Sequence, residues 1–152
     1  MTEPLRQQAS IDIAVPPDAA YEAVRHLERM GEWSPENRGG RWVDGDGSSV
    51  GDQFEGDNKR GELEWSFAVT VNAADPGTKF GFHTGPGEQP WVQWTYEFAP
   101  ADGGCTVTES WELLQAEPFV QALGEDYPAT RSAQMKDDLA TTLSNLKTSL
   151  ER

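Results

Sequence analysis

Apolar and polar residues alternate in five successive segments between residues 50 and 114. The clearest is LEWSFAVTV (63–71), in which every second residue is apolar without exception. The other four are VGDQFEG (50–56), TKFGFHT (78–84), VQWTYEF (92–98) and TVTESWELL (106–114). Alternation with a period of two predicts strands with one face toward a core. Short turns rich in Gly, Pro and Asp join the segments, which favours an antiparallel meander.

Elements with helical periodicity stand on both sides of this meander. ASIDIAV (9–15) alternates as an earlier strand, and after Pro16 and Pro17 a helix is predicted from the spacing of Tyr21, Val24, Leu27 and Met30. Residues 31–52 are rich in turn-forming residues, and we expect at most a helical turn and a short strand around Trp42. Near the C-terminus, one apolar stripe predicts a helix of about 20 residues, which Pro128 helps to start: Met135, Leu139, Leu143, Leu146 and Leu150.

The order of these elements predicts a single α+β domain over residues 1–152. A content of 36% hydrophobic and 10% aromatic residues is enough for one core. The long helix must lie across the apolar face of the sheet, with either a dry core or a hollow between them.

Five stretches carry a resemblance to a known family: IDIAVPPDAAYEAVRHLERMGEWSP (11–35), WVDGDGSSVGDQFEGDNKRGELEWSFAVTV (42–71), FGF (80–82), WTYEFAPADGGCTVTESWEL (94–113) and DDLATTLSNLKTSLE (137–151). Together they resemble the polyketide cyclase/dehydrase and lipid-transport superfamily, which includes START-related (SRPBCC-type) domains. The resemblance implies a helix-grip fold, in which a curved antiparallel sheet wraps around the long C-terminal helix with a ligand cavity between them.

One acidic residue interrupts the last apolar face, because Glu109 alternates in phase with Val107, Trp111 and Leu113. An ionised, unpaired carboxylate on such a face costs several kcal/mol. Glu109 is therefore a candidate cavity acid that orients a ligand hydroxyl or carbonyl, or transfers a proton. The alternatives are a β-bulge that turns it to solvent, or an ion pair with an arginine such as Arg60.

Other inward positions are candidates for ligand contact. Tyr96 offers a hydroxyl and is the second candidate for proton transfer, although the simpler interpretation is a core tyrosine whose hydroxyl bonds to the backbone. Asn58 shares a face with Phe54, where its amide is a candidate for ligand contact. The alternative is that Asn58 lies in a turn at the end of the strand. The aromatic candidates on inward faces are Trp65, Phe67, Phe82, Trp94 and Trp111. Trp33 and Trp42 flank the Gly-rich loop, where they either cover a ligand or anchor the loop on the sheet.

Neither a metal nor a cofactor is predicted. Residues 44–55 place Asp44, Asp46, Ser48 and Glu55 at ligand positions of an EF-hand, but Ser49 stands where that loop needs glycine and its flanks are strand-like. His26 and His83 have no companion ligands. No phosphate-binding glycine loop or nucleophile elbow appears.

A net charge of −14 repels phosphate backbones, so nucleic acid is excluded as a partner. The N-terminal residues lack the apolar stretch of a secretory signal, no apolar run reaches membrane-spanning length, and Cys105 is the single cysteine. These features predict a cytoplasmic protein, either a monomer or a homodimer, without membrane insertion.

Three functions agree with these residues. The first is binding of a hydrophobic or aromatic small molecule, such as a lipid or a polyketide-like compound, inside the cavity. The second is a cyclase or dehydratase that holds a polyketide-like chain in one folded shape, with Glu109 or Tyr96 in proton transfer. The third is a protein-interaction module with a filled core.

Overall fold

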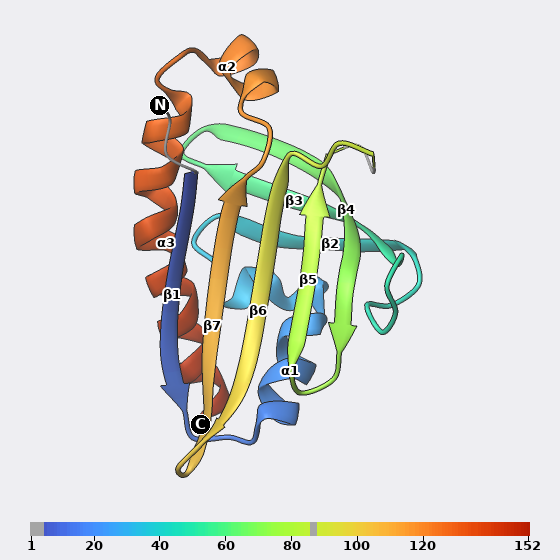
Figure 1. The fold of residues 1–152 in the computed structure, drawn as a ribbon, viewed down its shortest axis with the longest axis vertical. Coiled ribbons are helices and arrows are strands. Elements are labelled where there is room, and N and C mark those ends of the chain that lie inside the picture. Colours follow the sequence, from blue (N-terminus) through green and yellow to red (C-terminus); the bar gives the residue numbers. More distant parts are fainter. Residues whose placement is uncertain (1–4, 86–87) are drawn as a thin grey trace.

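The computed structural model describes residues 5–85 and 88–152 (Figure 1). The prediction of a single domain over residues 1–152 includes residues 1–4 and 86–87, which lie outside the described residues. The elements are β1 (Leu5–Ile13), α1 (Pro17–Arg25), the 3-10 helix η1 (Leu27–Glu32), β2 (Asn37–Asp44), β3 (Gln53–Arg60), β4 (Leu63–Asp75), β5 (Lys79–Thr84), β6 (Val92–Ala101), β7 (Gly104–Leu113), α2 (Glu117–Leu123) and α3 (Tyr127–Leu150).

The seven strands form one antiparallel sheet in the order β1-β7-β6-β5-β4-β3-β2. The meander predicted from the alternation is therefore confirmed, and the first strand joins it by pairing with β7. The sheet curves strongly, so that β2 and β3 cross behind the strands at its other edge (Figure 1). This curvature and the long C-terminal helix confirm the helix-grip fold class.

The pairing of β6 with β7 decides which side chains share the concave face. Its register runs from Val92 opposite Leu113 to Ala101 opposite Gly104 without a shift. Tyr96 is consequently opposite Glu109, and both side chains point inward with their apolar neighbours. The alternative of a β-bulge that turns Glu109 to solvent is wrong.

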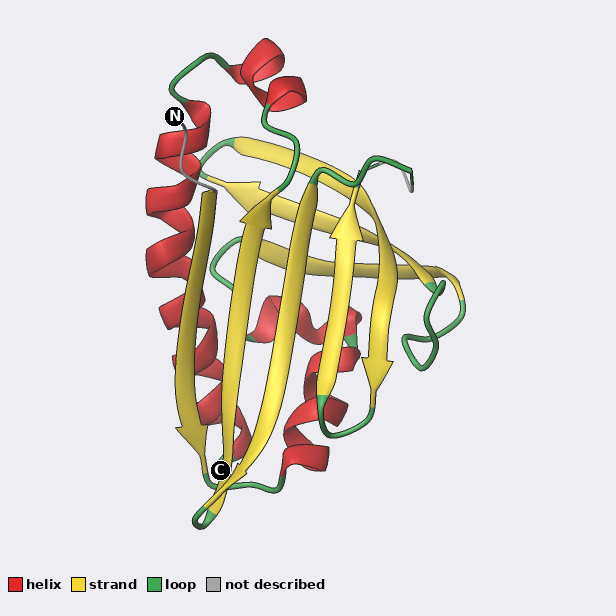
Figure 2. Ribbon diagram, in the orientation of Figure 1, coloured by secondary structure: helices red, strands yellow, loops and turns green. Residues whose placement is uncertain are grey.

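The helices α1 and α3 lie against one face of the sheet (Figure 2). The predicted apolar stripe of α3 is confirmed, since Met135, Leu139, Leu143 and Leu146 are each at most 1% exposed. Burying each such side chain contributes about 1.5–3 kcal/mol as an upper bound.

Three details differ from the predicted elements. The strand expected over residues 50–56 is β3 at Gln53–Arg60, and Val50 lies before it and is 65% exposed. The first helix ends at Arg25 because His26 leaves the helical region, with ψ at 78°, and the chain continues as η1. Leu27 and Met30 are still buried, which explains why the helical spacing extended past the break. The short helix α2 was not predicted; Pro118 lies in its first turn and Gly124, with φ at 102°, follows its end.

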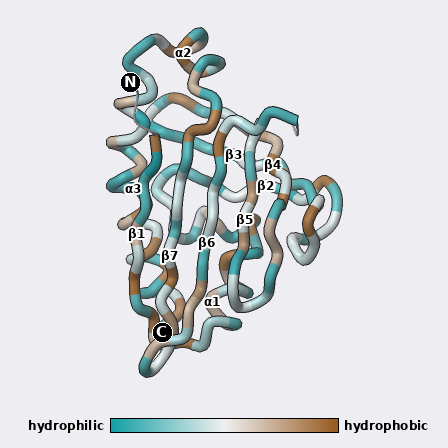
Figure 3. Tube along the Cα trace, viewed as in Figure 1, coloured by the Kyte–Doolittle hydropathy of each residue, from teal (hydrophilic) through white to brown (hydrophobic). Residues whose placement is uncertain are grey.

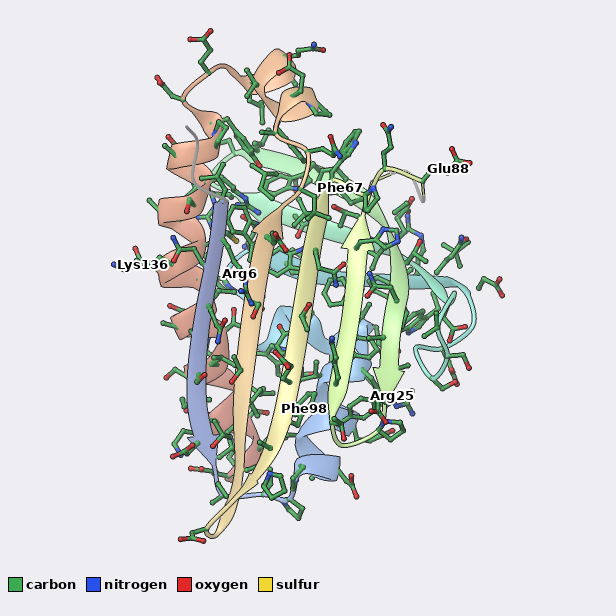
Figure 4. All side chains as sticks on the ribbon, in the orientation of Figure 1. Arg6, Arg25, Phe67, Glu88, Phe98 and Lys136 are labelled. Carbon is green, nitrogen blue, oxygen red and sulfur yellow. The ribbon has the colours of Figure 1, made fainter. Side chains whose placement is uncertain are left out.

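The interior is packed differently at the two ends of the sheet. At the α1 end, Tyr21 packs edge-on against Phe80 and Phe98, with ring centroids 6.0 and 5.6 Å apart. Figure 4 shows Phe98 at this end and Phe67 near the α2 end. The α1 end is filled by aromatic side chains, whereas the α2 end contains the cavity described next.

Candidate functional site

A cavity of about 580 Å³ lies between the concave face of the sheet and the helices α2, α3 and η1. Most of its wall is apolar, and large aromatic residues supply much of that surface. They come from five strands, from the segment just before β6 and from α2 and α3: Phe54, Trp65, Phe67, Phe82, Trp91, Trp94, Tyr96, Trp111, Phe119 and Tyr127. A space with this volume and lining is of the size that encloses a small organic molecule.

Two residues that line the cavity are nevertheless exposed to solvent: Leu63, the first residue of β4, is 57% exposed, and Leu123, the last residue of α2, is 55% exposed. Their exposure indicates that the cavity opens between α2 and the start of β4. Phe119 anchors α2 by stacking on Tyr127, with ring centroids 5.1 Å apart. Figure 3 shows that α2 carries hydrophobic residues. A short helix held mainly by aromatic contacts therefore covers the entrance.

Glu109 and Tyr96 form a polar pair inside the cavity. The Tyr96 hydroxyl donates to Oε2 of Glu109 at 2.7 Å, and the tyrosine and the glutamate are 1% and 2% exposed. The other carboxyl oxygen, Oε1, is buried and has no hydrogen-bond partner among the residues that the structure describes. Arg60 pairs with other residues, so the predicted alternative of an Arg60–Glu109 ion pair is wrong.

Burial changes the protonation of this pair. It raises the pKa of Glu109 from 4.5 to about 8, although the Tyr96 hydrogen bond lowers it; the charge of Asp138 raises it further. Burial and then the Glu109 charge raise the pKa of Tyr96 well above its usual value. At neutral pH Glu109 is consequently an acid that still holds its proton beside an apolar cavity.

A second polar cluster, which we call the ion network, consists of Glu36, Arg60, Arg131 and Asp138. Glu36 accepts hydrogen bonds from both terminal nitrogens of Arg131 at 2.5 and 2.6 Å, and from Nε of Arg60 at 3.1 Å. Arg60 also pairs with Asp138. All four residues line the cavity, and they join β3, α3 and the segment before β2.

In the ion network, the arginines favour the ionised forms of the two carboxyl groups. Burial raises the pKa of Glu36, but Arg131 and Arg60 outweigh that effect and hold it below its usual value. The pKa of Asp138 is raised, chiefly by burial, while Arg60 opposes the shift. With two cations and two carboxylates, the ion network has no net charge.

The structure brings eight of the ten predicted contact residues to the cavity wall: Asn58, Trp65, Phe67, Phe82, Trp94, Tyr96, Glu109 and Trp111. Trp33 and Trp42 do not line it, so their predicted role as a cover is wrong. Trp33 is 1% exposed in the filled core, and its carbonyl accepts a bond from Asn145. Trp42 packs on Phe54 and donates to Glu28 at 3.1 Å, which anchors the Gly-rich loop.

The sequence analysis did not identify the ion network as part of the site. One signal was present, because Arg131 stands four residues before Met135 and extends the buried stripe of α3. Asp138 follows Arg131 by seven residues and shares that face. Glu36 has no comparable signal, since it lies in a turn-rich segment without periodicity.

The EF-hand-like loop is closed by its own side chains. Oδ2 of Asp52 accepts hydrogen bonds from the backbone N–H groups of Asp46, Gly47 and Ser49. Within residues 5–85 and 88–152, no group of three or more His, Cys, Asp or Glu side chains is arranged to hold a metal ion. Nor does any helix of the described chain combine the length and apolar character needed to span a membrane.

Residues 5–151 match the family model described as "Polyketide cyclase / dehydrase and lipid transport". Among solved structures, the polyketide-cyclase-like protein Cgl2372 from Corynebacterium glutamicum is 30% identical, with a TM-score of 0.71. That match covers 99% of this chain and 94% of Cgl2372. The sequence has no match among curated proteins.

Two more distant structures share the fold. The di-domain aromatase/cyclase StfQ from the steffimycin biosynthetic pathway is 15% identical, with a TM-score of 0.71 over 95% of this chain and 50% of that chain. The protein TTHA0849 from Thermus thermophilus is 15% identical, with a TM-score of 0.68 over 94% of each chain.

Proposed function

The chain belongs to the polyketide cyclase/dehydrase and lipid-transport family, and from that premise we propose that it binds an apolar or aromatic small molecule between its sheet and α3. The observation that carries the proposal is the cavity of about 580 Å³, lined by aromatic side chains and opening beside two exposed leucines. Apolar surface in such a space is in contact with water until a ligand covers it, and covering it supplies binding free energy.

Gly56 offers a way to fill the cavity without replacing any of its polar side chains. It lies in β3 on the cavity wall, and a Cβ added there meets its nearest neighbour, Nδ2 of Asn37, at an ordinary 3.6 Å. We expect Gly56→Phe to weaken ligand binding by about tenfold or more, because the ring occupies the ligand's space; one tenfold step corresponds to about 1.4 kcal/mol.

The measurement is native mass spectrometry of the purified protein after exposure to a pool of fatty alcohols, sterols and aromatic ketones. Ala68→Phe is the matched control, since it adds the same ring to an exposed position of β4 on the opposite face. Wild type and Ala68→Phe should retain ligand, and Gly56→Phe should not. A wild type that takes up nothing from the pool, or a Gly56→Phe variant that binds normally, would reject the proposal.

The free Oε1 of Glu109 supports a second candidate, a cyclase acting on a polyketide-like chain. In this reaction a methylene carbon beside one carbonyl attacks a second carbonyl carbon. The oxygen of that second carbonyl takes the Glu109 proton, and the methylene proton returns to the carboxylate. Glu109→Gln is then expected to abolish turnover of a linear polyketone while its affinity stays near that of wild type. Equal turnover by both proteins would remove this candidate.

A further inference from the structure

We infer that the cavity selects uncharged ligands and excludes anions such as fatty-acid carboxylates. This inference rests on the proposed function and adds the charge class of the ligand. Its basis is the pairing of the only two cationic side chains that line the cavity among the described residues, Arg60 and Arg131.

Both guanidinium groups already face carboxylates. Arg131 is 9% exposed and binds Glu36 through two nitrogens, while a third contact goes to Gln134 at 3.2 Å. Arg60 is shared between Glu36 and Asp138. The charge of each guanidinium group is therefore already balanced by a carboxylate. An anion that took the place of Glu36 or Asp138 would leave that carboxylate without its partner, which is strongly unfavourable.

The rest of the described wall adds no positive charge that could balance an anion. The inner polar pair is a carboxyl group and a phenol, and Oε2 of Glu109 already occupies the Tyr96 hydroxyl. The protein as a whole carries a formal charge of −14, which lowers the local concentration of anions. A neutral ligand meets none of these penalties and still buries its apolar surface against the aromatic wall.

Two fluorescent probes with the same aromatic skeleton test this inference directly. N-phenylnaphthylamine is neutral, and anilinonaphthalene sulfonate adds one sulfonate to it. We expect the neutral probe to bind and the sulfonate to bind about tenfold more weakly or worse, measured by fluorescence titration at neutral pH. Competition by a fatty alcohol but not by the fatty acid of equal length should show the same preference.

A gain-of-binding variant checks the cause. Asp138→Asn removes one carboxylate from Arg60 and leaves the ion network with a surplus positive charge. The ratio of the affinity for the neutral probe to the affinity for the sulfonate should therefore fall severalfold. Asp137→Asn removes the same charge from the exposed neighbouring position of α3 and should leave the preference unchanged. An equal narrowing in both variants, or none in Asp138→Asn, would overturn the assignment to the paired arginines.

The two proposals fail in different ways. Equal affinity of wild type for both probes would overturn charge selection while leaving binding in the cavity intact. If neither probe binds, the proposed function and this inference fall together. If Gly56→Phe binds the neutral probe more weakly than wild type does, the fluorescence signal comes from probe bound in the cavity.

Discussion

Glu109→Gln is expected to stabilise the protein by about 5 kcal/mol above pH 8 and to leave its stability nearly unchanged below pH 4.5. In the folded protein, burial raises the pKa of Glu109 from 4.5 to about 8. The unfolded chain therefore releases this proton first, and the native state binds more protons across that window. Stability of the wild type falls as pH rises from 4.5 to 8, and one unit of pKa difference corresponds to about 1.4 kcal/mol.

Glutamine removes this loss because its amide does not ionise, while its oxygen still accepts the Tyr96 hydrogen bond. Urea unfolding of both proteins at several pH values between about 4 and 9 measures the difference. Asp138 also faces Glu109 and also has a raised pKa, but it is present in both proteins and largely cancels in the comparison. Glu112→Gln, on the opposite face of β7, is the control that should show no such trend. Parallel curves for wild type and Glu109→Gln would mean that folding does not raise the pKa of Glu109, which would contradict this prediction.

Most of the fold was predictable because the spacing of apolar residues within each element shows which of its faces is buried. Each strand from β4 to β7 has one apolar face, and α3 repeats its apolar residues on one side, so period alone identified them. In β3 the only large apolar side chain is Phe54, and the bounds predicted for that strand were less accurate. The break at His26 was not visible, because η1 continues to bury Leu27 and Met30 at nearly helical spacing. Helix α2 was missed because its seven residues are too few to establish a period.

The site was predictable only where it interrupts a pattern. Glu109 stood out because it is the one acid on an otherwise apolar face, and the unshifted pairing of β6 with β7 brings it to Tyr96. Glu36 interrupts no apolar pattern, since its neighbours in sequence are polar and turn-forming. Its burial follows from tertiary packing against Arg131, 95 residues further along the chain. Trp33 illustrates the opposite error, because a tryptophan beside a loop suits a core anchor as well as a ligand cover.

The cavity and the ion network belong to one structural argument. Close packing at the α1 end leaves little free volume, whereas at the α2 end the curved sheet and α3 diverge around a space that apolar side chains line but do not fill. The ion network joins β3 to α3 beside that space. It thereby connects the two walls of the cavity without adding net charge to its lining.

Arg131→Met is accordingly expected to lower the free energy of unfolding by about 3 kcal/mol at neutral pH. The substitution keeps a long apolar side chain but leaves Glu36, which is 6% exposed, with Arg60 as its remaining partner. Breaking a buried ion pair from one side typically costs about 3–5 kcal/mol because it leaves an uncompensated charge. Urea unfolding measures the loss, and Lys147→Met, which breaks the exposed pair with Glu151, is the control expected to cost at most about 1 kcal/mol.

The double variant Glu36→Leu with Arg131→Met separates lost attraction from the penalty of an unpaired charge. If the penalty dominates, the double variant should recover most of the stability lost in Arg131→Met, because both charges are then absent and Arg60 keeps Asp138 as its partner. A double variant that is less stable than the single one would mean that the Glu36–Arg131 pair contributes net attraction. A single variant no less stable than Lys147→Met would show instead that water reaches Glu36, and that the wall between β3 and α3 does not depend on the ion network.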